Sequence, residues 1–114
     1  MAQLTLNLPI GSVGFSFTPD AALEMKVALN QLMDSLKVAA NKPPAGTKVA
    51  PQKSMEYRYT GDVFLELFCN PNIYPTPFAA KVLITLRDDR IRVRVEAELM
   101  QLLEDLNQFL EAEG

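Results

Sequence analysis

The sequence predicts an α+β fold, an antiparallel β-meander with two helices packed on the sheet, in the order ββ-α-βββ-α. Three observations carry this prediction. Residues 90–95 alternate arginine with β-branched residues, which is typical of a strand with one buried and one solvated face. The apolar segment 82–86 lies just before them, separated only by a turn at Asp88 and Asp89. After about Glu96, apolar residues with helical spacing predict an acidic helix: Leu99, Leu102, Leu106 and Phe109.

The N-terminal half predicts two short strands and one helix. Residues 4–8 and 13–17 each alternate apolar and polar side chains around a turn at 9–11. Thr18, Pro19 and Asp20 then provide an N-cap hydroxyl, a proline at the first helical position and an acid in the first turn. We expect this helix to run to about residue 40 and to bury one stripe: Ala22, Met25, Leu29, Leu32, Met33, Leu36 and Ala40.

Residues 41–54 are the one obvious linker of the chain. Prolines, Gly46 and three lysines make up much of it, and few of its side chains favour burial. Fourteen residues without regular structure are long for a compact domain, so the segment is either mobile or functional. A mobile crossover and a docking strap for an acidic partner both remain open.

Residues 55–69 predict a long strand. Gly61, near its middle, indicates a bulge or bend that could divide it into two strands. One face is apolar, whereas the other is polar except for Phe64 and Phe68. A loop with three prolines follows at 70–77.

Length and composition indicate one domain, residues 1–114, with a formal net charge of −3. This charge makes nucleic acid an unfavoured partner. The longest apolar runs are far below the ~20 residues of a membrane span, and no positive charge precedes 4–8, so we expect no membrane association and no secretory signal. Cys69 is the single cysteine, which excludes an internal disulfide and fits a cytoplasmic location.

The chain contains no histidine. The commonest general base and the commonest zinc ligand are therefore missing, and with one cysteine no Cys/His metal cluster can form. Asp88 and Asp89 lack the ligand count of a calcium loop, and nothing in the sequence indicates a buried carboxylate. We expect no metal, no cofactor and no enzymatic activity; catalysis by carboxylates or tyrosines is the third-ranked hypothesis.

Four arginines surround the predicted hairpin: Arg87, Arg90, Arg92 and Arg94. As a functional feature they would form a basic stripe for phosphate, RNA or an acidic peptide. As a structural feature they would pair with Glu56, Asp62 or Glu66 across an exposed sheet, with about 0.2–1 kcal/mol per pair. The structural interpretation is favoured, because no RNA-binding signature accompanies the arginines.

Apolar residues beyond the needs of the core predict a protein interface. The last helix carries Met100, Leu103 and Leu110 beside its main stripe. Ile73, Tyr74 and Phe78 lie around the proline-rich loop, where aromatic residues would either anchor a partner or cover a sheet edge.

The half of the chain from Met55 to Leu110 resembles the COMM domain in layout. The residues that carry the resemblance are 76–79, which open an apolar strand, the short strand 91–95, and the leucine-rich segment 99–110. The resemblance implies a non-enzymatic adaptor that pairs with itself or with a relative. The chain lacks the tryptophan usual in that family, so Tyr57 or Tyr59 would have to take its place.

These observations predict a small cytoplasmic protein-interaction module: an adaptor, assembly factor or regulatory subunit that forms a homodimer. The alternative is nucleic-acid or phosphate-ligand binding through the strand face of Arg87 to Arg94.

Overall fold

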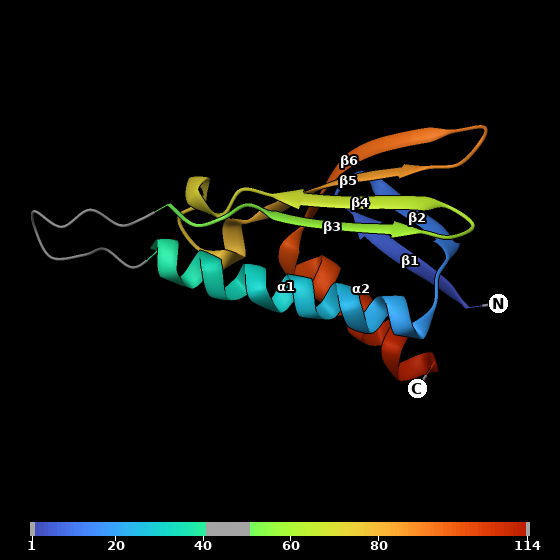
Figure 1. Cartoon of the computed structure of the whole chain (residues 1–114), viewed down its shortest axis with the longest axis horizontal. Coiled ribbons are helices and arrows are strands. Elements are labelled where there is room, and N and C mark those ends of the chain that lie inside the picture. Colours follow the sequence, from blue (N-terminus) through green and yellow to red (C-terminus); the bar gives the residue numbers. More distant parts are fainter. Residues whose placement is uncertain (1, 41–50, 114) are drawn as a thin grey trace, which may run out of the picture.

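The computed structural model describes residues 2–40 and 51–113 and confirms the α+β class (Figure 1). Strands β1 and β2 form an N-terminal hairpin that leads into helix α1, and four strands lead into helix α2. Two short 3-10 helices, η1 and η2, connect β4 to β5. The bounds are β1 Gln3–Leu8, β2 Gly11–Ser16, α1 Pro19–Ala40, β3 Met55–Thr60, β4 Phe64–Cys69, η1 Pro71–Ile73, η2 Pro77–Ala79, β5 Lys81–Arg87, β6 Arg92–Glu98 and α2 Leu99–Glu113.

Strands β3 to β6 form one antiparallel sheet in the order β3-β4-β5-β6, and β1 and β2 form a separate two-stranded sheet. Both helices lie on the same side of the four-stranded sheet (Figure 1). Helix α1 contacts β3 and α2, and α2 also contacts β1 and β6. The N-terminal hairpin and the two helices therefore together cover one face of the four-stranded sheet.

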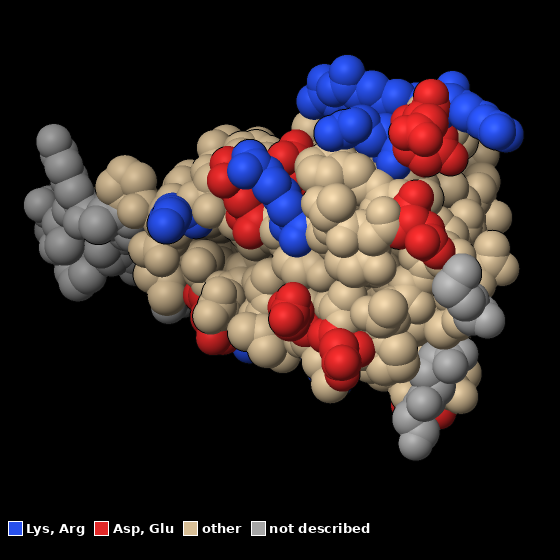
Figure 2. Space-filling view, turned by 45° about the vertical axis from the view of Figure 1, so that its right-hand side comes forward, with Lys and Arg blue, Asp and Glu red and all other residues tan. Residues whose placement is uncertain are grey.

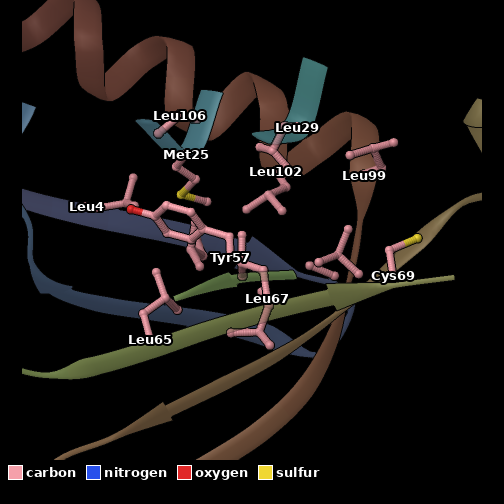
Figure 3. Packing of buried hydrophobic residues seen from close by; sticks show 14 of the residues in the cluster. Leu4, Met25, Leu29, Tyr57, Leu65, Leu67, Cys69, Leu99, Leu102 and Leu106 are labelled. Atoms are coloured by element: carbon pink, nitrogen blue, oxygen red, sulfur yellow. The ribbon is translucent and has the colours of Figure 1, made fainter. Parts of the chain in front are cut away.

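The core lies between that covered face and the helices (Figure 3). In β4 the buried side chains are Leu65, Leu67 and Cys69, which alternate with more exposed ones. The predicted apolar stripes of both helices pack against these buried side chains. Leu29, Leu102 and Leu106 are among the fully buried residues, so the periodicity of the helices identified their buried faces.

The segment 55–69 is two strands, not one. Val63 accepts a hydrogen bond from the backbone N–H of Gly61 at 3.1 Å, which closes a tight turn between β3 and β4. A Cβ atom at Gly61 would clash with the ring of Tyr59, so glycine allows this close approach. The element order is therefore ββ-α-ββββ-α, and the predicted meander has one strand more than expected.

Helix α1 begins as predicted. The Thr18 hydroxyl accepts a hydrogen bond from Ala21 N at 3.1 Å, and Pro19 is the first helical residue. The Tyr57 hydroxyl donates to the carbonyl oxygen of Ala21 at 3.0 Å and ties β3 to this first turn. Burial is the main cause that raises the pKa of Tyr57 to about 12, with the nearby Glu24 as the second cause.

Helix α2 begins later than predicted, at Leu99 instead of about Glu96. Glu96 and Glu98 belong to β6, because its pairing with β5 continues to Lys81. Leu99 N donates to the carbonyl oxygen of Ala80 at 3.0 Å where the strand passes into the helix. The first turn of α2 holds no acidic residue, so no carboxylate in that turn stabilises the helix dipole.

Of the predicted linker at 41–54, residues 41–50 lie outside the described residues. Residues 51–54 have no regular secondary structure. Asn72 in η1 holds them at one point, because its side chain accepts from Gln52 N at 2.7 Å and donates to Gln52 O at 2.8 Å. In the part of the chain that the structure describes, neither helix is long and apolar enough to span a membrane.

Candidate interaction surface

The four-stranded sheet has a second face that neither the helices nor the N-terminal hairpin covers (Figure 1). We call it the open face. It consists of the side chains that alternate with the buried ones along β3 to β6: Glu56, Arg58, Thr60, Phe64, Glu66, Phe68, Lys81, Leu83, Thr85, Arg87, Arg92, Arg94, Glu96 and Glu98.

The apolar side chains of the open face lie on its two inner strands, β4 and β5. Phe68 on β4 stands directly opposite Leu83 on β5, and its side chain is 37% exposed. Phe64 and Leu83 are half-buried. Thr85, next to them on β5, is only 6% exposed, although it points away from the helices. The larger side chains around Thr85 therefore shelter it.

The charges of the open face separate along the direction of the strands. Arg87 and Arg92 form a cross-strand pair near the β5–β6 turn, and Arg94 follows one step along β6. Glu56, Glu96 and Glu98 lie further from that turn. Figure 2 shows Lys and Arg gathered on the β5–β6 hairpin. One end of the open face is thus basic and the other is acidic.

Few of these charges are paired with one another or with other residues that the structure describes. Arg58 and Glu66 form a salt bridge of 2.7 Å between β3 and β4. Arg87 places its guanidinium 4.5 Å from the centre of the Phe64 ring, a cation–π contact. Within residues 2–40 and 51–112, Arg90, Arg92 and Arg94 take part in no ion pair. The expectation that they pair with Glu56, Asp62 or Glu66 is therefore wrong.

A shallow cleft of about 390 Å³ lies between the β3–β4 turn and the β5–β6 turn. Asp88 closes the second turn, because one of its carboxylate oxygens accepts from Arg90 N at 2.8 Å and Ile91 N at 2.9 Å. These two hydrogen bonds lower the pKa of Asp88. Arg90 lies in this turn and not on the strand face where the alternation of residues 90–95 placed it, because β6 begins at Arg92.

The six predicted interface residues differ in exposure. Ile73 and Phe78 are 65% and 79% exposed, and both lie in the connection between β4 and β5. Tyr74 is half-buried, and its hydroxyl donates to the carbonyl oxygen of Lys81 at 3.2 Å. The three residues of the last helix are half-buried and pack against the core: Met100, Leu103 and Leu110.

Sequence reasoning missed one buried carboxylate. Asp105 in α2 is 4% exposed, although the sequence indicated none. Its oxygens accept from Asn7 N at 2.7 Å, Asn7 Nδ2 at 2.8 Å and Gln101 Nε2 at 2.9 Å. These bonds join α2 to β1 and occupy the carboxylate, so its role is structural. In the described residues no group of three or more carboxylates and thiols is arranged to hold a metal ion.

Cys69 ends β4 on the covered face and is 2% exposed. Burial raises the pKa of its thiol to about 11, so at neutral pH the thiol stays protonated and unreactive. It is a small residue of the core. No protein-family model, no curated protein and no solved structure matches this chain.

Proposed function

We propose that this protein is a non-enzymatic interaction module, an adaptor, assembly factor or regulatory subunit, and that the open face of its sheet binds a protein. The observation that carries the proposal is a group of apolar side chains on the two inner strands of a face that no described helix or strand covers. Phe64, Phe68 and Leu83 lie there among charged side chains. Apolar and aromatic residues ringed by polar ones are the arrangement that protein interfaces use.

The local pattern of β4 supports the same proposal. A strand that faces water on one side needs polar residues there, but β4 places Phe64 and Phe68 on the solvent side of Leu65 and Leu67. Neither phenylalanine belongs to the buried core, which lies on the other face. Their presence is explained if a partner removes them from water, since about 25 cal/mol is gained for each Å² of apolar surface buried.

A site-specific photo-crosslinker tests the proposal. The photoreactive analogue p-benzoylphenylalanine replaces Phe68 on the open face, and in a matched variant it replaces Val27, which is exposed on α1. After irradiation in the source cells, mass spectrometry identifies the linked peptides, and purified components reproduce each link. We expect defined links from position 68 that position 27 does not give. Equal and diffuse labelling from both positions would contradict the proposal.

The second candidate function is binding of a phosphate group or nucleic acid by the β5–β6 hairpin. It is favoured by Arg92 and Arg94, which have no ion pair in the described part of the chain. Against it, Asp62, Asp88 and Asp89 line the cleft beside Arg87 and Arg90. Titration with a single-stranded oligonucleotide tests it: binding must weaken steeply with salt and be lost in Arg92→Glu/Arg94→Glu.

The resemblance of the C-terminal half to the COMM domain stays a prediction. It agrees with the proposed adaptor role, and the chain has four strands, not three, ahead of the last helix.

A further inference from the structure

We infer that the free edge of strand β6 pairs, antiparallel, with the same edge of a second copy of this chain, so that two four-stranded sheets join into one continuous sheet. The inference goes beyond the proposed function, because it concerns the edge of the sheet and not its open face. Three features of β6 carry it: the direction of its backbone groups, the order of its charges and the partial exposure of its valines.

The backbone groups of β6 point alternately toward β5 and away from it. Leu99 N donates to Ala80 O and Asp88 N donates to Ile91 O, both at 3.0 Å. Pairs in an antiparallel ladder alternate between hydrogen-bonded and non-hydrogen-bonded, so the odd-numbered residues of β6 turn their N–H and C=O groups toward β5. The even-numbered residues turn theirs outward: Arg92, Arg94, Glu96 and Glu98.

This outer edge of β6 is available for pairing. In the part of the chain that the structure describes, no hydrogen bond joins the backbone of the four outward residues to another element. Sheets usually protect an edge with a bulge, a proline or a very short strand. Strand β6 instead pairs with β5 without interruption over its seven residues, and it contains no proline. Charge is the feature that decides what this edge can bind.

The charges on the outward residues follow the order plus, plus, minus, minus along the strand. In the reverse direction the order is minus, minus, plus, plus, so an antiparallel copy can present the opposite sign at every position. Arg94 of one copy then lies beside Glu96 of the other, and Arg92 lies beside Glu98. Two-fold symmetry repeats both pairs and places Val95 on the axis.

Backbone direction and charge together select this register. Outward groups must meet outward groups, so even-numbered residues pair with even-numbered ones and the axis falls on a residue. An axis on Arg94 or on Glu96 would set that residue beside its own copy. An axis on Val93 or on Ala97 would set two arginines or two glutamates beside each other. The axis on Val95 pairs all four charges with opposite ones.

The valines of β6 fit the same register. Val93 and Val95 point to the covered face but are only half-buried, whereas Ala97 is 1% exposed. In the dimer, Val95 meets Val95 of the other copy and Val93 meets Ala97. Both are non-hydrogen-bonded pairs, in which side chains are closest. The pairing therefore removes apolar surface that the edge leaves in water.

Strand β3, at the other edge of the sheet, is the weaker candidate. Gly61 N donates to Val63 O, so the outward residues of β3 are also the even-numbered ones: Glu56, Arg58 and Thr60. Arg58 already forms a salt bridge of 2.7 Å with Glu66. The four outward charges of β6 take part in no ion pair within residues 2–40 and 51–112. They are therefore free to pair with a second copy.

Edge pairing leaves both open faces on the same side of the joined sheet, because the two-fold axis is perpendicular to the strands and to the sheet. The dimer would present the proposed binding surface twice, side by side. A partner with two matching sites would then bind more tightly than a partner with one. This consequence depends on the proposed function, whereas the dimer itself does not.

Sedimentation velocity on the purified full chain, from about 1 to 500 µM, tests for the dimer, since a small edge interface predicts a Kd in the micromolar range. Arg94→Glu should weaken the dimer about tenfold or more, because it places two like-charge pairs in the interface. Arg58→Glu, the matched reversal on β3, should leave dimerisation unchanged. A dimer that used the open faces would respond to both variants. Both side chains are exposed, so circular dichroism should show unchanged folds.

Disulfide formation between matched cysteine variants tests the register. Val95→Cys places a thiol on the axis, with its Cβ about 4.5–5.5 Å from that of the other copy, which suits a disulfide. Val93→Cys places its two thiols about 13 Å apart along the strands. Under mild oxidation, position 95 should form linked dimers at least about tenfold faster than position 93. Wild type should give none, because Cys69 is 2% exposed.

Three results would overturn the inference. One is a monomer over the whole concentration range, and another is a position 95 that links no faster than position 93. The third is a dimer that Arg58→Glu weakens as much as Arg94→Glu does. If a cysteine variant fails to fold, the comparison of the two arginine variants still decides. The photo-crosslinks from Phe68 test the proposed function separately, because β4 lies two strands away from the β6 edge.

Discussion

The two faces of the four-stranded sheet differ in what their apolar residues do. On the covered face, Leu65 and Leu67 are fully buried by the helices and the N-terminal hairpin. On the open face of the same strand, Phe64 and Phe68 remain partly in water. The covered face accounts for the fold, so the apolar residues of the open face need another explanation, and the proposed protein partner would provide one.

The covered face should respond most strongly to truncation. Leu67→Ala removes a fully buried side chain from the centre of the core, and we expect a loss of about 2–5 kcal/mol in the free energy of unfolding. Phe68→Ala, the next residue on the same strand, should cost less than about 1 kcal/mol in the monomer, because its side chain is 37% exposed. Urea denaturation measures both. Equal losses of stability in the two variants would contradict the difference between the covered face and the open face.

Loss of the buried hydrogen bonds between α2 and β1 should have the second-largest effect on the free energy of unfolding. Asp105→Ala leaves two donors of Asn7 without their partner, and we expect a loss of about 2–3 kcal/mol. Glu104→Ala, the exposed neighbour in the same helix, is the control and should change stability by less than about 0.5 kcal/mol. Thermal unfolding followed by circular dichroism compares the two variants.

Alkaline pH should weaken the covered face. Folding raises the pKa of Cys69 from 9.0 to about 11 and that of Tyr57 from 10.0 to about 12. Both groups keep their protons longer in the folded state, so their contributions are complete below pH 9 and are lost as the pH rises toward 12. Urea midpoints measured across this range should fall, and Tyr57→Phe should reduce the fall above about pH 10. If the urea midpoint of Tyr57→Phe fell with pH as steeply as that of the wild type, Tyr57 would be excluded as a source of the pH dependence.

The charges of the open face should matter least to folding. A double-mutant cycle on Arg58→Ala and Glu66→Ala should give a coupling of about 0.5 kcal/mol or less, because the Arg58 side chain is 64% exposed. The measurement is made at a concentration where the protein is monomeric. A coupling above about 1.5 kcal/mol would mean that this pair stabilises the sheet and is not a surface contact.

Much of the fold was predictable from local pattern. The alternation of residues 4–8, the cap at Thr18 and the stripes of both helices each reflect the short-range physics of one element. Two boundaries were wrong for tertiary reasons. Glu96 and Glu98 have good helix propensity, but they extend the pairing of β6 with β5, and long-range hydrogen bonds outweighed local preference. The long strand at 55–69 divides where the chain turns back at Gly61 to pair with itself.

Less of the candidate surface was predictable. Phe64 and Phe68 stood out as apolar residues on a polar face, which was the available signal for the open face. The arginines were identified, but their lack of ion pairs depends on where β3 lies relative to β6, at opposite edges of the sheet. Asp105 looked like its acidic neighbours in α2, because nothing in the helix itself indicates that Asn7 would lie against it.

The sequence by itself determined which segments become strands and helices and which side of each helix is buried, because those features depend on periods of two and 3.6 residues. Only the tertiary structure decided that the other face of the four-stranded sheet is left open, since both helices and the N-terminal hairpin lie on one side of it. It also decided that the basic end and the acidic end lie on the same, open face of the sheet. The cross-strand register sets which charged side chains are neighbours, because it pairs residues from different strands.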